Sequence, residues 1–171
     1  MMPRLYKGLI IAALMLAVSG CAFAAFAAEE MHAITFDDLI SLGRIGDFEV
    51  SPDGERIAME VTWFNKEANS SNSDIYLLNL KNDKLWDFVR NEADDYAPAW
   101  APDGKSIYFV STRSGRAEIW NIPINGGEAK RISDVPTGTS QPLVSPDGRY
   151  IAFTSRVYPG CKDMSCNGKK L

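Results

Sequence analysis

The sequence predicts an all-β fold, a partial β-propeller of four-stranded antiparallel blades, from two observations. A Pro-Asp-Gly turn occurs three times, at residues 51–54, 101–104 and 145–148, so that steps of 50 and 44 residues separate its prolines at 52, 102 and 146. A strand-like run of aliphatic and aromatic residues follows each copy. Repeats of this length that carry several short strands are typical of propeller blades.

The turn motif has a structural explanation. Proline presets the backbone angle at the second position, Asp suits the third, and Gly supplies a left-handed conformation before the next strand. Ser51 and Ser145 can hydrogen-bond their own backbone two residues on. A metal or catalytic role for Asp53, Asp103 and Asp147 is the alternative, but positions that recur with a repeat usually solve a repeated folding problem. We therefore expect these carboxylates to shape turns.

Matched strand patterns fill the intervals between the turns. The order acid, Ile, aromatic in Asp74-Ile75-Tyr76 recurs 44 residues later in Glu118-Ile119-Trp120. Asn82-Asp83 and Asn125-Gly126-Gly127 then supply hairpin turns. The expected strands are 48–50, 56–64, 74–80 and 84–89 in the first blade, and 98–100, 106–111, 118–123 and 130–133 in the second.

The blades stop before a ring could close. We expect an incomplete propeller domain over residues 34–171, with blades at about 47–90 and 97–134 and a partial blade at 141–171. The partial blade has strands at 142–144 and 150–155, and nothing after residue 155 resembles its third strand. Closed propellers have about four to eight blades, and natural proteins avoid uncovered strand edges. The expectation is that the chain is the opening part of a longer protein.

A short helix is expected before the first blade, at residues 35–43. Thr35 suits the N-cap, two aspartates follow it in the first turn, and Gly43 can end the helix. Phe36, Leu39 and Ile40 fall on one face at helical spacing. This pattern predicts a lid packed on the first blade.

The N-terminal residues have the features of an export signal. Arg4 and Lys7 precede an apolar stretch at 8–18 that is too short to span a bilayer comfortably. Residues 18–21, Val-Ser-Gly-Cys, are similar to a bacterial lipobox, which predicts a signal peptide at 1–20 and lipidation of Cys21. The alternative is ordinary cleavage after about residue 27. Either signal would export the protein to the periplasm, and a lipid on Cys21 would anchor it to a membrane.

Cys161 and Cys166 remain if Cys21 is lipidated or removed. In an oxidising compartment such a neighbouring pair is expected to form a local disulfide. Zinc is the alternative, but it would need two further ligands, and the one histidine, His32, is distant in sequence. We therefore expect a disulfide that shapes a surface insertion, and no metal or other cofactor.

Charge argues against nucleic-acid binding. Cleavage before Cys21 removes two basic and no acidic residues, so the net charge moves from −4 to −6. The most basic segment, residues 112–116, has the serines and glycine of a hairpin loop rather than a basic face. Any membrane attachment would run through the lipid alone.

No catalytic residue is predicted in this chain. The sequence has no Gly-x-Ser-x-Gly nucleophile elbow, and His32, the one candidate base, lies between the signal and the first helix. Trp63, Trp86, Trp100 and Trp120 could line a ligand groove, but their positions in strands or beside turns favour packing between blades. The acidic residues at 92–96 are expected to form a solvated loop between the first two blades.

These features together resemble the N-terminal propeller of the prolyl oligopeptidase family, in its bacterial acylaminoacyl-peptidase and dipeptidyl-peptidase branch. The lead helix ending near residues 43–47, the turns at 51–54 and 145–148, and the segment 157–161 with Cys166 carry the resemblance. The turns are also similar to those of the TolB propeller. The resemblance extends over nearly everything after the signal.

The peptidase resemblance implies a following α/β-hydrolase domain with a Ser-Asp-His triad, which this chain lacks. It also implies that the propeller restricts the substrates to short peptides. The favoured function is therefore the non-catalytic, gating part of an exported serine peptidase. A TolB-like periplasmic propeller that binds proteins is the rival, and a carbohydrate-binding module is a weaker third possibility.

Overall fold

The computed structural model describes residues 32–171, which fall into two compact units. The first unit, residues 1–34, contributes only its last three residues to the description. The second unit, Thr35–Leu171, contains every described helix and strand. None of the described helices is long and apolar enough to cross a membrane.

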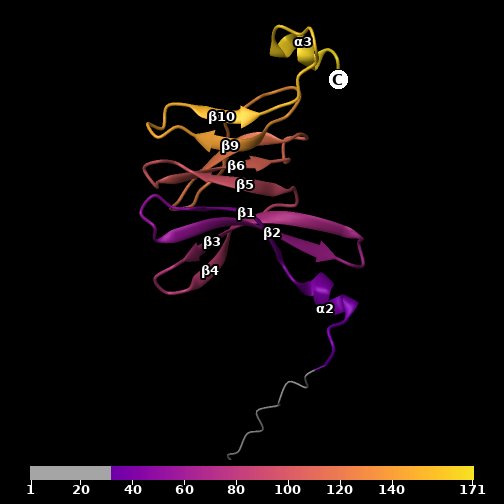
Figure 1. Cartoon of the computed structure of the whole chain (residues 1–171), viewed down its shortest axis with the longest axis vertical. Coiled ribbons are helices and arrows are strands. Elements are labelled where there is room, and N and C mark those ends of the chain that lie inside the picture. Colours follow the sequence, from indigo (N-terminus) through magenta and orange to yellow (C-terminus); the bar gives the residue numbers. More distant parts are fainter. Residues whose placement is uncertain (1–31) are drawn as a thin grey trace, which may run out of the picture. The chain divides into compact units, whose positions relative to one another are not determined.

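The second unit consists of antiparallel sheets in chain order (Figure 1). The first sheet has the order β1-β2-β3-β4, the second β5-β6-β7-β8, and the third pairs β9 with β10. This arrangement confirms the prediction of a partial propeller with two complete blades and part of a third. The strands are β1 Arg44–Val50, β2 Arg56–Asn65, β3 Ser70–Asn79, β4 Lys84–Val89, β5 Asp95–Trp100, β6 Ser106–Ser111, β7 Glu118–Pro123, β8 Lys130–Arg131, β9 Ser140–Val144 and β10 Ile151–Thr154.

Several strand bounds differ from the predicted ones. β8 has two residues instead of four. Beyond it the pairing is irregular, because the Ile119 N–H donates to the side-chain Oγ of Ser133 over 2.8 Å while the Ile132 and Ser133 N–H groups both donate to the Ile119 carbonyl. β1 and β5 begin earlier than predicted and contain irregularities in register, between Ile45 and Phe48 and between Tyr96 and Ala99. β2 and β3 are each ten residues long and form an extended hairpin.

The core lies between the first two blades. β5 packs against β1, β2 and β3, and β9 packs against β5, β6 and β7. The buried cluster takes side chains from both complete sheets: Ala58, Ile75, Leu77, Val89, Trp100, Ile107, Phe109 and Ile122. Burying each large aliphatic or aromatic side chain contributes about 1.5–3 kcal/mol. The stacking of blades is therefore the main source of stability, and large apolar side chains on the outer sheets, such as Phe48 and Leu143, stay exposed.

The Pro-Asp-Gly turns have the predicted left-handed glycines, with φ of 70°, 67° and 68° at Gly54, Gly104 and Gly148. Contrary to the expectation, the hydroxyl of Ser51 does not bond the backbone two residues further on. It donates to Asp53 Oδ1 over 2.5 Å and accepts from the Arg56 N–H over 2.9 Å. The hydroxyl donates its hydrogen bond to the carboxylate because an ionised carboxylate is a stronger acceptor than a backbone carbonyl. Ser145 makes the same bonds in the third turn.

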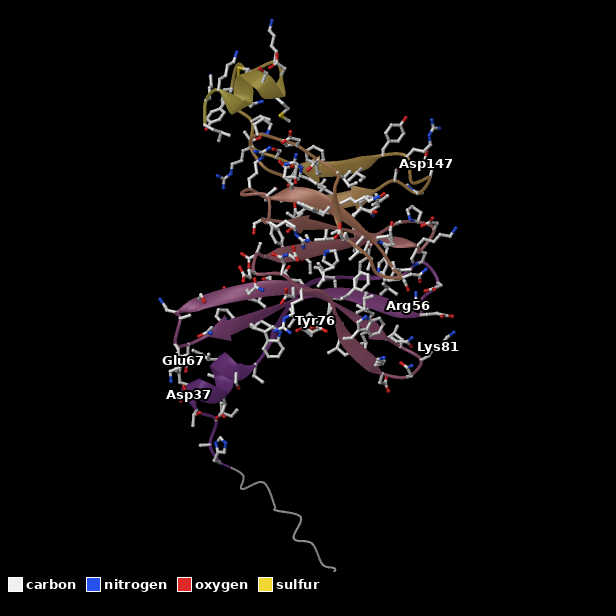
Figure 2. All side chains as sticks on the ribbon, turned by 180° about the vertical axis from the view of Figure 1, so that it is seen from behind. Asp37, Arg56, Glu67, Tyr76, Lys81 and Asp147 are labelled. Atoms are coloured by element: carbon white, nitrogen blue, oxygen red, sulfur yellow. A yellow bond between two sulfur atoms is a disulfide. The ribbon has the colours of Figure 1, made fainter. Side chains whose placement is uncertain are left out.

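Successive turns lie near one another. A Cβ added to Gly104 would lie 3.9 Å from Pro52 Cδ, and one added to Gly148 would lie 3.9 Å from Pro102 Cδ. Figure 2 shows Arg56, Lys81 and Asp147 on the turn side of the sheets and Glu67 on the opposite side. The proline of each turn thus lies against the glycine of the next.

The lead helix, α2 Phe36–Ser41, has Thr35 as its N-cap, as predicted, and Asp38 completes a capping box with it. Its end differs, because Gly43 has no left-handed conformation. A Cβ at Gly43 would lie 2.9 Å from the Trp63 ring and from Val61, so glycine is needed for close packing. The helix contacts β2, and Lys66 pairs with Asp37. The helix has no buried residue, so it lies beside the hairpin instead of forming a packed lid.

Candidate functional site

The predicted site residues lie in different places. Cys21 and the predicted signal sequence fall outside the described residues. His32 is exposed in the first unit, with Nδ1 2.9 Å from the Ala33 carbonyl oxygen. Within residues 32–171, no group of three or more His, Cys, Asp or Glu side chains is placed to hold a metal ion.

Cys161 and Cys166 are joined by a disulfide, with their Cα atoms 5.4 Å apart. The bridge closes a loop around a short helix that the sequence did not predict, α3 Met164–Gly168. Asp163 caps this helix by accepting the Cys166 N–H over 2.8 Å. The sequence signal for the helix was therefore an N-cap aspartate three residues before Cys166.

Buried carboxylates hold the two linkers between blades. In the first linker, residues 90–94, the Asn91 N–H donates to Asp74 Oδ1 over 3.1 Å. In the second linker, residues 132–139, the Val135 N–H donates to both carboxylate oxygens of Glu118, over 3.0 and 3.2 Å. Asp74 and Glu118 are the acids of the repeated acid-Ile-aromatic pattern. The pattern revealed their equivalence, but their role as linker acceptors was missed.

Glu118 has more donors than Asp74. Arg116 Nε donates to Glu118 Oε1 over 2.6 Å, and the hydroxyl of Ser133 donates to Oε2. Asp74 receives only a long additional contact of 3.4 Å from the Asn72 amide. Burial raises the pKa of Asp74 above its usual value, since the hydrogen bond from Asn91 offsets only part of the desolvation.

The acidic segment at 92–96 was expected to be a solvated loop, and this is wrong for Asp95. Its side chain is fully buried at the start of β5, where Oδ2 accepts from Arg113 over 2.7 Å. Burial raises the pKa of Asp95, and the Arg113 guanidinium counteracts this shift. Arg113 also lies over the Trp120 ring at 4.9 Å. The arginines of the 112–116 hairpin are therefore partners of buried acids, a role that charge spacing alone did not indicate.

A polar cavity of about 370 Å³ lies between the second and third blades, on the linker side of the sheets. One wall is formed by Thr137, Gly138, Thr139 and Ser140 of the second linker and β9, and the other by Thr154, Ser155 and Arg156, with Tyr96 and Ala117 completing the lining. Burial raises the pKa of Tyr96, and nearby Asp94 and Glu60 add to the shift. This cavity is the candidate binding site.

The serine and threonine hydroxyls of the cavity donate to groups within the protein. Ser155 Oγ donates to the Gly138 carbonyl over 2.6 Å, so Thr137 donates to Ser155 over 2.9 Å. Thr154 donates to the Ser140 carbonyl over 3.3 Å, so Ser140 donates to Thr154 over 2.7 Å. Their remaining lone pairs can accept from a ligand, while exposed Arg156 can donate. The described lining holds no carboxylate, histidine or cysteine, and its hydroxyls and Arg156 are its hydrogen-bonding groups.

The tryptophans behave in two ways. Trp100 is buried between blades, as predicted, and its Nε1 donates to the Glu49 carbonyl of the first blade over 3.1 Å. Trp86 and Trp120 pack against the same core. Trp63 departs from the prediction, because it is 44% exposed and packs beside Gly43 on the extended hairpin.

Residues 43–166 match the family model of the TolB β-propeller domain, PD40. The uncharacterized peptidase YuxL of Bacillus subtilis is 35% identical over 128 residues, which are 74% of this chain and 20% of that protein. Dipeptidyl-peptidase 5 of Porphyromonas gingivalis is 28% identical over 124 residues, 72% of this chain and 18% of that protein. The chain thus spans about a fifth of the length of these relatives.

Two solved structures have the same fold. A candidate TolB of Agrobacterium tumefaciens has a TM-score of 0.57 and 26% identity, over 71% of this chain and 41% of that one. The acylaminoacyl peptidase of Pyrococcus horikoshii has a TM-score of 0.57 and 20% identity, over 73% of this chain and 19% of that one. The repeated turns, the stacked four-stranded sheets and the family match together place this chain in the TolB β-propeller (PD40) family.

Proposed function

We propose that this chain is the propeller portion of an exported serine peptidase that acts on short peptides. In this proposal the propeller limits access to an α/β-hydrolase domain, its partner in the full-length protein. The observation that carries the proposal is the likeness to YuxL, a protein named as a peptidase, of which the chain covers 20%. The remaining length of such relatives leaves room for the catalytic domain.

The chemistry of the cavity supports a substrate-filtering role. Its hydroxyl lone pairs and the Arg156 guanidinium complement the N–H and C=O groups of an extended peptide. Exposed apolar side chains on the outer sheets, including Phe48 and Leu143, support the presence of further blades.

A TolB-like propeller that binds proteins without catalysis is the second candidate. The match to the TolB propeller family and the 26% identity to the Agrobacterium protein favour it. The coding sequence past Leu171 separates the two candidates. A Gly-x-Ser-x-Gly motif followed by Asp and His supports the peptidase, and a stop after a few more blades supports the binding protein.

The biochemical test uses the full-length product and the 171-residue piece side by side. The full-length protein should hydrolyse a chromogenic aminoacyl or dipeptidyl substrate, and the piece should be inactive. Changing His32 to Ala should leave the activity of the full-length protein intact, because we assign no chemistry to His32. Hydrolysis by the piece, lost in the His32→Ala variant, would contradict the proposal.

Export is proposed on the N-terminal sequence. Mass spectrometry after expression in a Gram-negative host should find an N-terminus at lipid-bearing Cys21, or near residue 28 without lipid. An uncleaved protein in the cytosol would be the contrary result. Alkylation of the same periplasmic sample should leave Cys161 and Cys166 unmodified until a reductant is added.

A further inference from the structure

The disulfide loop, residues 158–168, is an internally bonded unit. Asn167 is its centre, only 3% exposed, and it joins the two ends of the loop. Its Oδ1 accepts the Tyr158 N–H over 2.8 Å, and its Nδ2 donates to the Asp163 carbonyl over 3.0 Å. The disulfide holds Cys161 and Cys166 together between these contacts. Breaking the bridge therefore releases the covalent link that keeps Asn167 and its partners in register.

The loop packs directly on the second linker. Gly168 lies so close to Pro136 that an added Cβ would be 2.9 Å from Pro136 Cβ and 3.1 Å from its Cγ. Real Cβ atoms essentially never approach at the shorter distance, so only glycine fits without movement. The end of the disulfide loop therefore packs against Pro136 of the second linker. The disulfide loop follows the third blade in the chain, and the first linker is not the segment it packs on.

The linker segment beside Pro136 forms one wall of the cavity. The next residue, Thr137, bonds Ser155, and Ser155 bonds the Gly138 carbonyl, so three hydroxyl and carbonyl groups tie the two walls together. Gly138 and Thr139 are held further by backbone bonds to Val135 and Ala117, both at 2.8 Å. A continuous chain of contacts thus runs from the disulfide through Gly168 and Pro136 to the cavity walls.

We propose that the disulfide loop is a redox-sensitive clamp on the cavity between the second and third blades. With the bridge intact, Gly168 holds Pro136 and the second linker in the geometry that defines the cavity. A dithiol reductant transfers two electrons and two protons: the sulfur–sulfur bond of Cys161 and Cys166 breaks, both become thiols, and the dithiol becomes a disulfide. Both cysteines are partly exposed, so a small reductant can reach them. The proposal is independent of the peptidase function.

Hydrogen exchange of the full-length protein, oxidised and reduced, tests the clamp at individual amides. Reduction should speed exchange at Gly138 and Thr139 about tenfold, because the linker opens locally more often. The Asn91 amide of the first linker, bonded to Asp74, is the internal control and should not change. A Cys161→Ser, Cys166→Ser variant should show the fast exchange without reductant.

Gly168→Ala should also disturb the contact between the disulfide loop and the second linker, and it does so with the disulfide intact. Its added Cβ should displace Pro136 and speed exchange at Gly138 and Thr139, while Ser165→Ala, on an exposed position of α3, should not. Faster exchange confined to residues 158–167 after reduction would show a self-contained loop and overturn the clamp. Equal acceleration at Asn91 would indicate general unfolding and would overturn it as well.

Discussion

In both complete blades a carboxylate of the third strand, Asp74 within β3 and Glu118 at the start of β7, accepts a linker backbone N–H from 17 residues further along. The donor is Asn91 for Asp74 and Val135 for Glu118. Their surroundings differ. Glu118 also receives Arg116 and Ser133, whereas Asp74 has one good donor and a long contact to Asn72. The repeated sequence pattern therefore determines the position of the carboxylate that accepts the linker N–H. The other donors around each carboxylate determine how strongly it stabilises its linker.

The largest effect is expected from removing the two acceptors separately. Glu118→Ala leaves Arg116, Ser133 and the Val135 N–H without their shared partner and should cost about 3 kcal/mol of unfolding free energy. Asp74→Ala should cost about 1 kcal/mol, since it removes one strong hydrogen bond and relieves a buried charge. Denaturant unfolding of the full-length protein measures both, with exposed Glu128→Ala as the control. Equal losses at the two positions would contradict the proposed difference.

The comparison also predicts a pH dependence for the first linker. Burial raises the pKa of Asp74 and Asp95 in the folded state above the unfolded value of about 3.9. Their contribution to the unfolding free energy therefore increases as the pH falls from neutral through the raised folded pKa, and it levels off below about 3.9.

A variant carrying Asp74→Asn and Asp95→Asn isolates this contribution. Between pH 7 and pH 4 the wild-type protein should gain stability relative to the variant. The turn carboxylates give the opposite dependence of stability on pH, because hydrogen bonds from Ser51 and Ser145 lower the pKa of Asp53 and Asp147. Their stabilisation is present above about pH 3.9 and is lost as the pH falls through the lowered pKa. A pH-independent difference between the proteins would argue against buried, proton-binding carboxylates at 74 and 95.

Effects of about 1 kcal/mol or less are expected at the turns. The three turns can be compared because Ala101 stands in the second turn where the first and third have a serine. Ser51→Ala should cost about 1 kcal/mol, because it leaves the Arg56 N–H without the buried hydroxyl. Ser145→Ala should cost less, since Ser145 is only half-buried. Ala101 stands at the equivalent position of the second turn, and Ala101→Ser should add about 0.5 kcal/mol. A loss of stability in Ala101→Ser would show that the second turn has no room for the hydroxyl.

The sequence predicted those features that depend on local chemistry. The left-handed glycines of the turns, the N-cap position of Thr35 and the repeated strands follow from residue type and spacing. Features that depend on contacts between blades could not be found in this way. Asp95 sits in an acidic run that suggests solvent exposure, and only the position of Arg113 across the sheet explains why it is buried.

The candidate site shows the same limit. Its lining comes from the second linker, the exit of β10 and Tyr96, segments that carry no shared motif. Gly43 illustrates a related difficulty, because its position after a helix suggested a cap and the neighbouring Trp63 ring explains the need for glycine. In such cases the sequence shows that glycine is required at a position, and only the packing of neighbouring side chains shows why.

The same spatial step, with Pro52 near Gly104 and Pro102 near Gly148, joins successive turns although the prolines are 50 and 44 residues apart. The repeat therefore tolerates a difference in length between its turns. The longer interval contains β2 and β3, which have ten residues each, whereas β6 and β7 have six each. The hairpin of β2 and β3 ends at the exposed residues 66–69. An epitope tag or a small reporter domain inserted between Glu67 and Ala68 would extend this hairpin into solvent and leave the blade-to-blade step unchanged.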